Sequence, residues 1–119
     1  MNEIESKAER ILKECGAEET DAGFFDVVRA VRKMVEEYYR GNLWPYGNNV
    51  YLLYCLIANE GQVKRKPYSI DNAVRRFIKR LDYAKLESMF RNVLYVRGDY
   101  MTSPHDFVYA LMKCVTKKE

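Results

Sequence analysis

The sequence is poor in the side chains on which most catalytic and metal sites depend. Its 119 residues include a single histidine, His105, and three cysteines that never form a C-x-x-C pair. Metal sites and acid–base mechanisms that need two or more imidazoles are therefore excluded. The sequence also contains neither a G-x-x-x-x-G-K-S/T nor a G-x-G-x-x-G phosphate loop, and its carboxylates are scattered. We therefore predict a protein that is not an enzyme, with no catalytic residue, no metal ion and no cofactor.

Long apolar stretches are missing as well. The longest uninterrupted one, residues 50–58, has nine residues, whereas a membrane span needs about 18 to 20. The first residues, Met1-Asn2-Glu3, are acidic where a signal peptide would be basic and then apolar. Cys15, Cys55 and Cys114 lie far apart on apolar helical positions, which favours small buried hydrophobes in a reducing compartment. We expect a cytoplasmic protein with no membrane partner.

What the chain does have is enough apolar material for one core. It is 48% hydrophobic and 31% charged, which at this length fits a single helical domain over residues 1–119. Residues 50–58 carry no charge and no polar gap, so the element they form should be wrapped on all sides. Asn48 and Asn49 as good N-caps and Gly61 as a C-terminal stop favour a helix there over a buried strand. We predict that this helix is central, with Leu53 and Leu56 buried.

Amphipathic helices are expected before and after this apolar segment. Apolar residues recur at helical spacing over residues 3–15, from a cap at Thr20 or Asp21 to about residue 40, over 70–81 after Ser69, and after Ser103-Pro104. Asp82 caps a shorter helix, and residues 93–101 form either its continuation or a short β-hairpin, of which we favour the hairpin. The predicted fold is therefore all-α, a bundle of five or six helices around the central one. Two polar features are expected at its surface, a solvated face from Asp26 to Lys33 and a solvent-facing His105.

The net charge of +3 hides a strong asymmetry. Residues 1–23 hold seven acids and three bases, a net charge of −4, whereas residues 64–80 hold seven bases and one acid, a net charge of +6. The first segment should avoid a polyanion and the second should attract one. The bases of the second segment are Lys64, Arg65, Lys66, Arg75, Arg76, Lys79 and Arg80.

The helix expected over 70–81 places its charges on one side. Val74, Phe77 and Ile78 should face the core, whereas Arg75, Arg76, Lys79 and Arg80 should face outward together. Like charges one turn apart destabilise a helix by roughly a few tenths of a kcal/mol per pair. A helix selected only for stability would have glutamates between these bases. One interpretation is a solvated surface; the other, which we favour, is a surface that binds nucleic-acid phosphates.

Four aromatic residues are candidates for stacking on bases. Tyr68 and Tyr83 bracket the basic helix, and Trp44 and Tyr46 lie in the connector 41–49, which is rich in glycine and asparagine. For Trp44 we favour a different interpretation, in which Leu43 and Trp44 fold back as a lid over the core.

Two other functions are considered from the residues. The helices over 50–58 and 70–81 could belong to a helix-turn-helix or winged-helix DNA-binding regulator, although a link of about eleven residues is longer than the usual turn. HEPN ribonucleases have an arginine four to six residues before a histidine. Here seven residues separate Arg97 from His105, and Pro104 intervenes, so that motif is not matched.

The layout of the chain resembles the small helical subunits of archaeal CRISPR interference complexes. The resemblance consists of an acidic first helix, an apolar helix at 50–58 and a basic helix containing Arg75-Arg76-Phe77-Ile78-Lys79-Arg80. It implies a non-catalytic subunit of an antiviral defense complex, present in several copies, that contacts a DNA or RNA backbone and neighbouring protein subunits.

Overall fold

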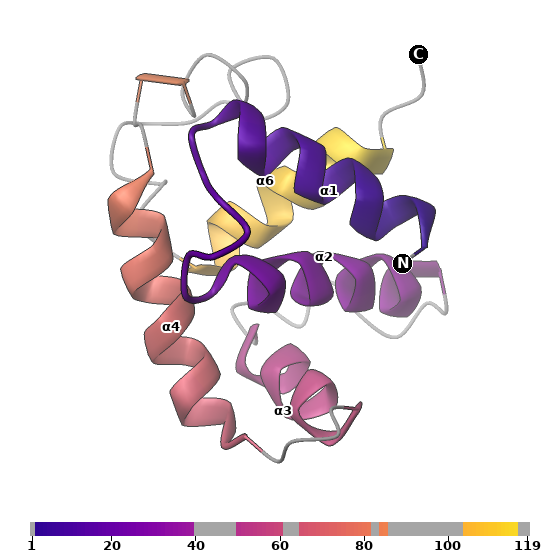
Figure 1. Ribbon diagram of the computed structural model, residues 1–119. Coiled ribbons are helices and arrows are strands. Elements are labelled where there is room, and N and C mark those ends of the chain that lie inside the picture. The colour runs from indigo at the N-terminus through magenta and orange to yellow at the C-terminus, as the bar shows by residue number, and fades with distance from the viewer. Residues whose placement is uncertain (1, 40–49, 61–64, 82–83, 86–103, 117–119) are drawn as a thin grey trace.

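The structure, a computed structural model, describes residues 2–39, 50–60, 65–81, 84–85 and 104–116, and the regular secondary structure in these residues is helical. The helices are α1 (Glu3–Glu14), α2 (Phe24–Tyr39), α3 (Val50–Glu60), α4 (Pro67–Arg80) and α6 (Pro104–Thr116) (Figure 1). These residues contain no strand, and the predicted all-α class is confirmed. Several predictions lie outside the described residues. They are the hairpin at 93–101, the cap at Asp82, and the positions of Trp44, Tyr46, Lys64 and Tyr83.

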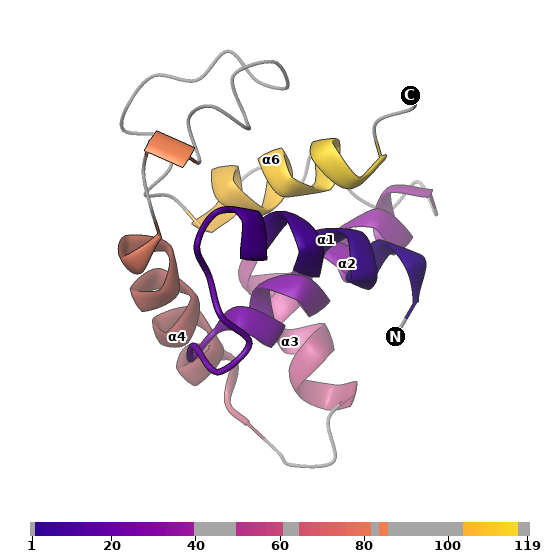
Figure 2. The same cartoon turned by 45° about the horizontal axis from the view of Figure 1, so that its top comes forward.

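The helix at the centre of the bundle is α2. It packs against α1, α3, α4 and α6, and it crosses the middle of Figure 1 with α1 and α6 above it and α3 below. The second view shows the same arrangement, with α4 along one edge of the molecule (Figure 2). Side chains from every one of these helices meet in a single core. They include Leu12 of α1, Phe24 and Val31 of α2, Leu53 of α3, Phe77 of α4 and Phe107 of α6.

The prediction that residues 50–58 are wrapped on all sides is wrong. These residues do form a helix, but among the described elements its main packing partners are α2 and α4. Leu53 is buried as predicted, whereas Leu56 is only half-buried, and Tyr51 and Leu52 are each 46% exposed. An apolar segment need not be buried on all sides, because much of the surface of any folded protein is apolar.

Two helices begin at other residues than predicted. α2 begins at Phe24 because Gly23, with φ +91°, turns the chain just before it; the Asp21 carboxylate accepts from the backbone N–H of Glu18 at 2.9 Å instead of capping a helix. α4 begins at Pro67, whose missing N–H costs nothing at a first helical position, and Ser69 therefore lies inside its first turn. The start of α6 at Pro104 and the end of α1 before Gly16 are as predicted.

The N-terminus of α2 touches the backbone of α4. A Cβ atom at Gly23 would lie 2.6 Å from the carbonyl oxygen of Ala73. The ring of Phe24, the next residue in the chain, meets that of Phe77, one turn beyond Ala73, edge to face with centroids 6.1 Å apart. These contacts fix how α4 lies on the bundle and therefore which of its sides faces out.

An ion-pair cluster joins the side of α2 to the end of α3. The Lys33 Nζ lies 2.5 Å from Glu60 and 3.2 Å from Glu36, and Arg32 also pairs with Glu60. Partial burial works to raise the pKa of Glu60, but the hydrogen bonds from Lys33 and Arg32 outweigh it and lower this pKa below its ordinary value. Arg32 and Lys33, which were expected to lie on an ordinary solvated face, are thus engaged in tertiary contacts.

Two other predictions about single side chains are settled by burial. Cys15 is buried in the core as predicted, while Cys55 and Cys114 are half-buried. His105 does not face solvent: its side chain is 16% exposed and its ring stacks on Tyr109 at 6.3 Å between centroids. α6 is fully covered on the side that holds Phe107 and lies against α1 and α2, which leaves His105 on its flank.

Candidate nucleic-acid interface

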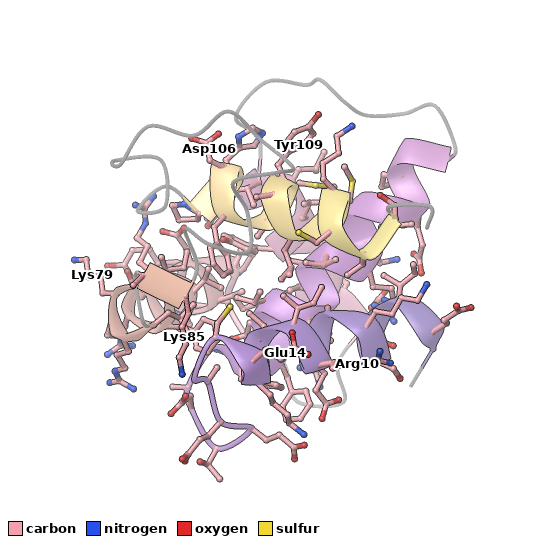
Figure 3. The ribbon with its side chains drawn as sticks, turned by 90° about the horizontal axis from the view of Figure 1, so that it is seen from above. Arg10, Glu14, Lys79, Lys85, Asp106 and Tyr109 are labelled. Carbon is pink, nitrogen blue, oxygen red and sulfur yellow. The ribbon has the colours of Figure 1, made fainter. Side chains whose placement is uncertain are left out.

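α4 has one apolar side and one basic side, as predicted. Ile70, Ala73, Val74, Phe77 and Ile78 are buried at a spacing of three and four residues, which is the spacing that creates a continuous helical face. The basic side chains on the other side are all exposed. They are Arg75, Arg76, Lys79 and Arg80. Viewed from above, Lys79 extends from α4 at the outer edge of the molecule (Figure 3).

The two arginines in the middle of α4 are oriented by the helix itself. Arg75 donates from Nε to the Asp71 carboxylate at 3.0 Å, and Arg76 donates from Nε to the carbonyl oxygen of Asn72 at 3.4 Å. Asp71 lies in the second turn, because the helix begins at Pro67, and so it pairs with Arg75 instead of serving the helix N-terminus. A guanidinium has five N–H donors, so both arginines keep their Nη groups for a partner in solution.

The remaining cations of this side lack counterions. In the described part of the chain, Arg76, Lys79 and Arg80 form no ion pair with an acid, and Asp71 is the one acid of α4. Lys79 and Arg80 lie in the last turn, where the negative end of the helix dipole favours cations. Arg76 lies too far from that end to benefit and has no acid partner, so helix stability does not explain its presence, whereas Arg75 is paired with Asp71 one turn away.

Arg65 and Lys66 precede α4 and differ in their surroundings. The Arg65 Nη1 lies 2.6 Å from Oδ1 of Asp26, whose side chain is only 6% exposed, whereas that of Arg65 is 40% exposed. The prediction that Asp26 belongs to a solvated face is therefore wrong. A buried carboxylate needs a charged or hydrogen-bonding partner, and Arg65 supplies it from a position 39 residues away in the chain. Lys66, at the N-cap of α4, is exposed and continues the basic side.

A tyrosine that the sequence did not single out as part of the site lies beneath it. Tyr54 of α3 is fully buried, and within the described residues its hydroxyl has no hydrogen-bond partner. Burial raises the pKa of this phenol, and the negative charge of Asp71 raises it further. Tyr54 is therefore a neutral residue of the core, and the charges of Asp71 and Arg75 act on its hydroxyl.

Tyr68 is the most exposed large hydrophobic residue among those described, at 65%. It lies in the first turn of α4, on the outer side of the helix. Of the four residues predicted to stack on bases, it is the one whose position the structure describes. The structure therefore brings together on α4 one exposed ring and the four exposed cations.

The acidic N-terminal segment has a different arrangement. On α1 the acids alternate with bases at helical spacing, and the pairs form: Glu3 with Lys7 at 3.2 Å and Glu9 with Lys13 at 2.9 Å. Lys13 also lies 2.5 Å from Glu19, beyond the end of the helix. These hydrogen bonds raise the pKa of Lys13 and lower that of Glu19. The charges of α1 thus largely neutralise one another.

No protein-family model, curated protein sequence or solved structure matches this chain. Among the residues that the structure describes, no group of histidine, cysteine and acidic side chains is placed to hold a metal ion. In the same part of the chain, none of the helices has the length and apolar character needed to cross a membrane.

Proposed function

We propose that this protein is a non-catalytic subunit of a larger complex, and that it binds the backbone of a nucleic acid through the outer side of α4. The observation that carries the proposal is the set of four exposed cations on one side of a helix whose other side is buried in the core. Lysine and arginine neutralise phosphates without reading sequence, so such a surface suits backbone binding. Arg76 supports it most, because it has no acid partner in the described chain and lies outside the last turn of α4.

The second part of the proposal is assembly with other proteins, including further copies of this chain. Two half-exposed apolar side chains on α3, Tyr51 and Leu52, are of the kind that contact a neighbouring subunit. The resemblance to small subunits of CRISPR interference complexes supports the same idea. The acidic first helix and the basic α4 of that layout are present, whereas the apolar helix lies at the periphery instead of the centre.

The test replaces all four cations at once, as Arg75→Gln, Arg76→Gln, Lys79→Gln and Arg80→Gln. Binding of single- and double-stranded DNA and RNA is measured over a series of salt concentrations. The parent should lose affinity steeply as salt is added, and the variant should bind more weakly with a salt slope reduced by about one unit per lost phosphate contact. The fold should survive, because none of the four side chains is buried.

A matched control removes cations from the acidic segment instead, as Lys7→Gln, Arg10→Gln and Lys13→Gln. These residues lie on α1, where the first and third are paired with glutamates, so affinity should not fall. A folded four-residue variant that binds as tightly as the parent at every salt concentration would contradict the proposal.

A DNA-binding regulator of the helix-turn-helix type is the second candidate. The link between α3 and α4 is residues 61–66, shorter than the eleven expected, because α3 continues to Glu60 and α4 already begins at Pro67. The length of this link is therefore closer to that of the turn in the motif, which has about three or four residues. A regulator should discriminate between duplex sequences by about a thousandfold or more, whereas a backbone-binding subunit should not.

A further inference from the structure

We infer that the nucleic acid bound at α4 is single-stranded, and that Tyr68 stacks on one of its bases. The inference rests on the proposed function and names its substrate class. Its starting point is the exposed phenol ring: Tyr68 is 65% exposed, and within the described chain its ring has no stacking or cation–π contact. An aromatic ring left in water at the edge of a basic surface is the arrangement with which proteins hold unpaired bases.

The ring and the cations form one line along the helix. Tyr68, Asn72, Arg75 and Lys79 follow one another at spacings of four, three and four residues, which places them on a single face of α4. At 1.5 Å per residue, Arg75 lies about 10 Å and Lys79 about 16 Å along the axis from Tyr68. This length corresponds to about five nucleotides of one strand at 3.4 Å each, and to fewer if the strand is extended. A strand lying along this line therefore meets the ring at one end and cations at the other.

The order of the ring and the cations along α4 argues against a duplex as the ligand. Recognition helices enter the major groove with their N-terminal residues, which contact base edges. The N-terminal half of α4 instead carries an exposed ring at Tyr68 and a carboxylate at Asp71, and its four cations lie in the C-terminal half. A ring also gains nothing from a base that is already stacked and paired, whereas an unpaired base offers its whole face.

The backbone at Tyr68 is fixed before any ligand binds. It follows Pro67 at the first helical position, and Ile70, two residues on, is buried in the core. A tyrosine has only two side-chain torsions to fix, so little conformational freedom is lost when its ring stacks.

The test compares Tyr68→Ala with Tyr68→Phe on the full chain. The probes are labelled homopolymers of about 15 nucleotides, as single-stranded DNA and RNA, and a DNA duplex of the same length. Tyr68→Ala should weaken binding of the single strands by about 5- to 150-fold, leave their salt slope unchanged and leave duplex binding unchanged. Tyr68→Phe keeps the ring and should bind like the parent. Ser69→Ala, at the exposed position next to Tyr68 in the first turn of α4, is the control and should change nothing.

The failure of this inference is distinguishable from that of the proposed function. If Tyr68→Ala binds single strands like the parent, or weakens duplex binding equally, the inference is overturned while the loss of binding in the four-cation variant still supports the proposed function. If the four-cation variant binds like the parent, the proposed function fails and the inference fails with it. Melting followed by circular dichroism establishes that each variant is folded.

Discussion

α1 and α4 are both short amphipathic helices on the outside of the same bundle, yet they use their charges in opposite ways. On α1, acids and bases alternate at one-turn spacing and form the pairs Glu3–Lys7 and Glu9–Lys13. On α4, Asp71 pairs with Arg75, but the other charged residues one turn apart are Arg75 with Lys79 and Arg76 with Arg80, which repel each other. The charge pattern of α1 is explained by helix stability alone. That of α4 is not, which is why α4 is the part of the surface to which we assign a binding partner.

The two helices also differ in the space around the glycine beside each of them. Substituting these glycines gives the largest predicted change in the free energy of unfolding. Gly16 after α1 and Gly23 against α4 both have φ +91°, but a Cβ at Gly16 meets nothing within 4 Å. Gly16→Ala should therefore cost only backbone strain, about 1 to 2 kcal/mol of unfolding free energy. Gly23→Ala adds a clash with the Ala73 backbone and should cost about 2 to 5 kcal/mol. Equal losses in urea unfolding would mean that α4 is not anchored at this glycine.

The ion pair beside α4 should matter more than those on α1, and it should do so asymmetrically. Arg65→Gln leaves the buried carboxylate of Asp26 without its cation and should cost about 2 to 3 kcal/mol, less than for a fully buried pair because water reaches Arg65. Asp26→Asn leaves a cation that is 40% exposed and an amide oxygen that still accepts from it, so it should cost about 1 kcal/mol. Thermal or urea unfolding that ranks these two variants in the reverse order would contradict this account.

The smallest effect bears directly on the contrast between the two charge patterns. Glu9→Gln on α1 breaks the pair with Lys13 and should lower stability by about 0.3 kcal/mol. Arg76→Gln on α4 relieves repulsion from Lys79 and Arg80 and should raise stability by a similar amount, about 0.3 kcal/mol. Urea midpoints measured at low salt provide the check. If Arg76→Gln were as destabilising as Glu9→Gln, the cations of α4 would be engaged within the protein and the difference between the helices would vanish.

The sequence predicted the faces of the helices better than their positions. The period of apolar residues identifies α1, α4 and α6 and their buried sides, because burial of one face leaves a local pattern. The start of α2 was misplaced, because Gly23 turns the chain next to Ala73, a contact made by a distant residue. The sequence also did not predict the central position of α2, for a similar reason. The surface of α2 that packs against other helices includes Asp26, and a charged residue is normally predicted to be exposed. Its burial depends on the pair with Arg65, which is distant in the sequence.

The candidate site was predictable to the same extent. Exposure of the four cations follows from their register with Val74 and Phe77, so the sequence alone identified them. The role of Arg65 did not follow, because its partner is 39 residues away. Tyr68 was a candidate only through its position beside the basic helix, and its exposure became evident from the structure.

The packing of α6 has a consequence for how the molecule is made. α6 covers α1 and α2, and even the closest ends of α1 and α6, Glu14 and Pro104, are 90 residues apart in the chain. Such distant contacts close a large loop and tend to form late in folding. At a synthesis rate of about 5 to 20 residues per second, residues 104–116 are made roughly 5 to 20 seconds after α1. Until then Leu12 has no cover from α6, and the nascent chain displays an apolar surface that the finished protein conceals.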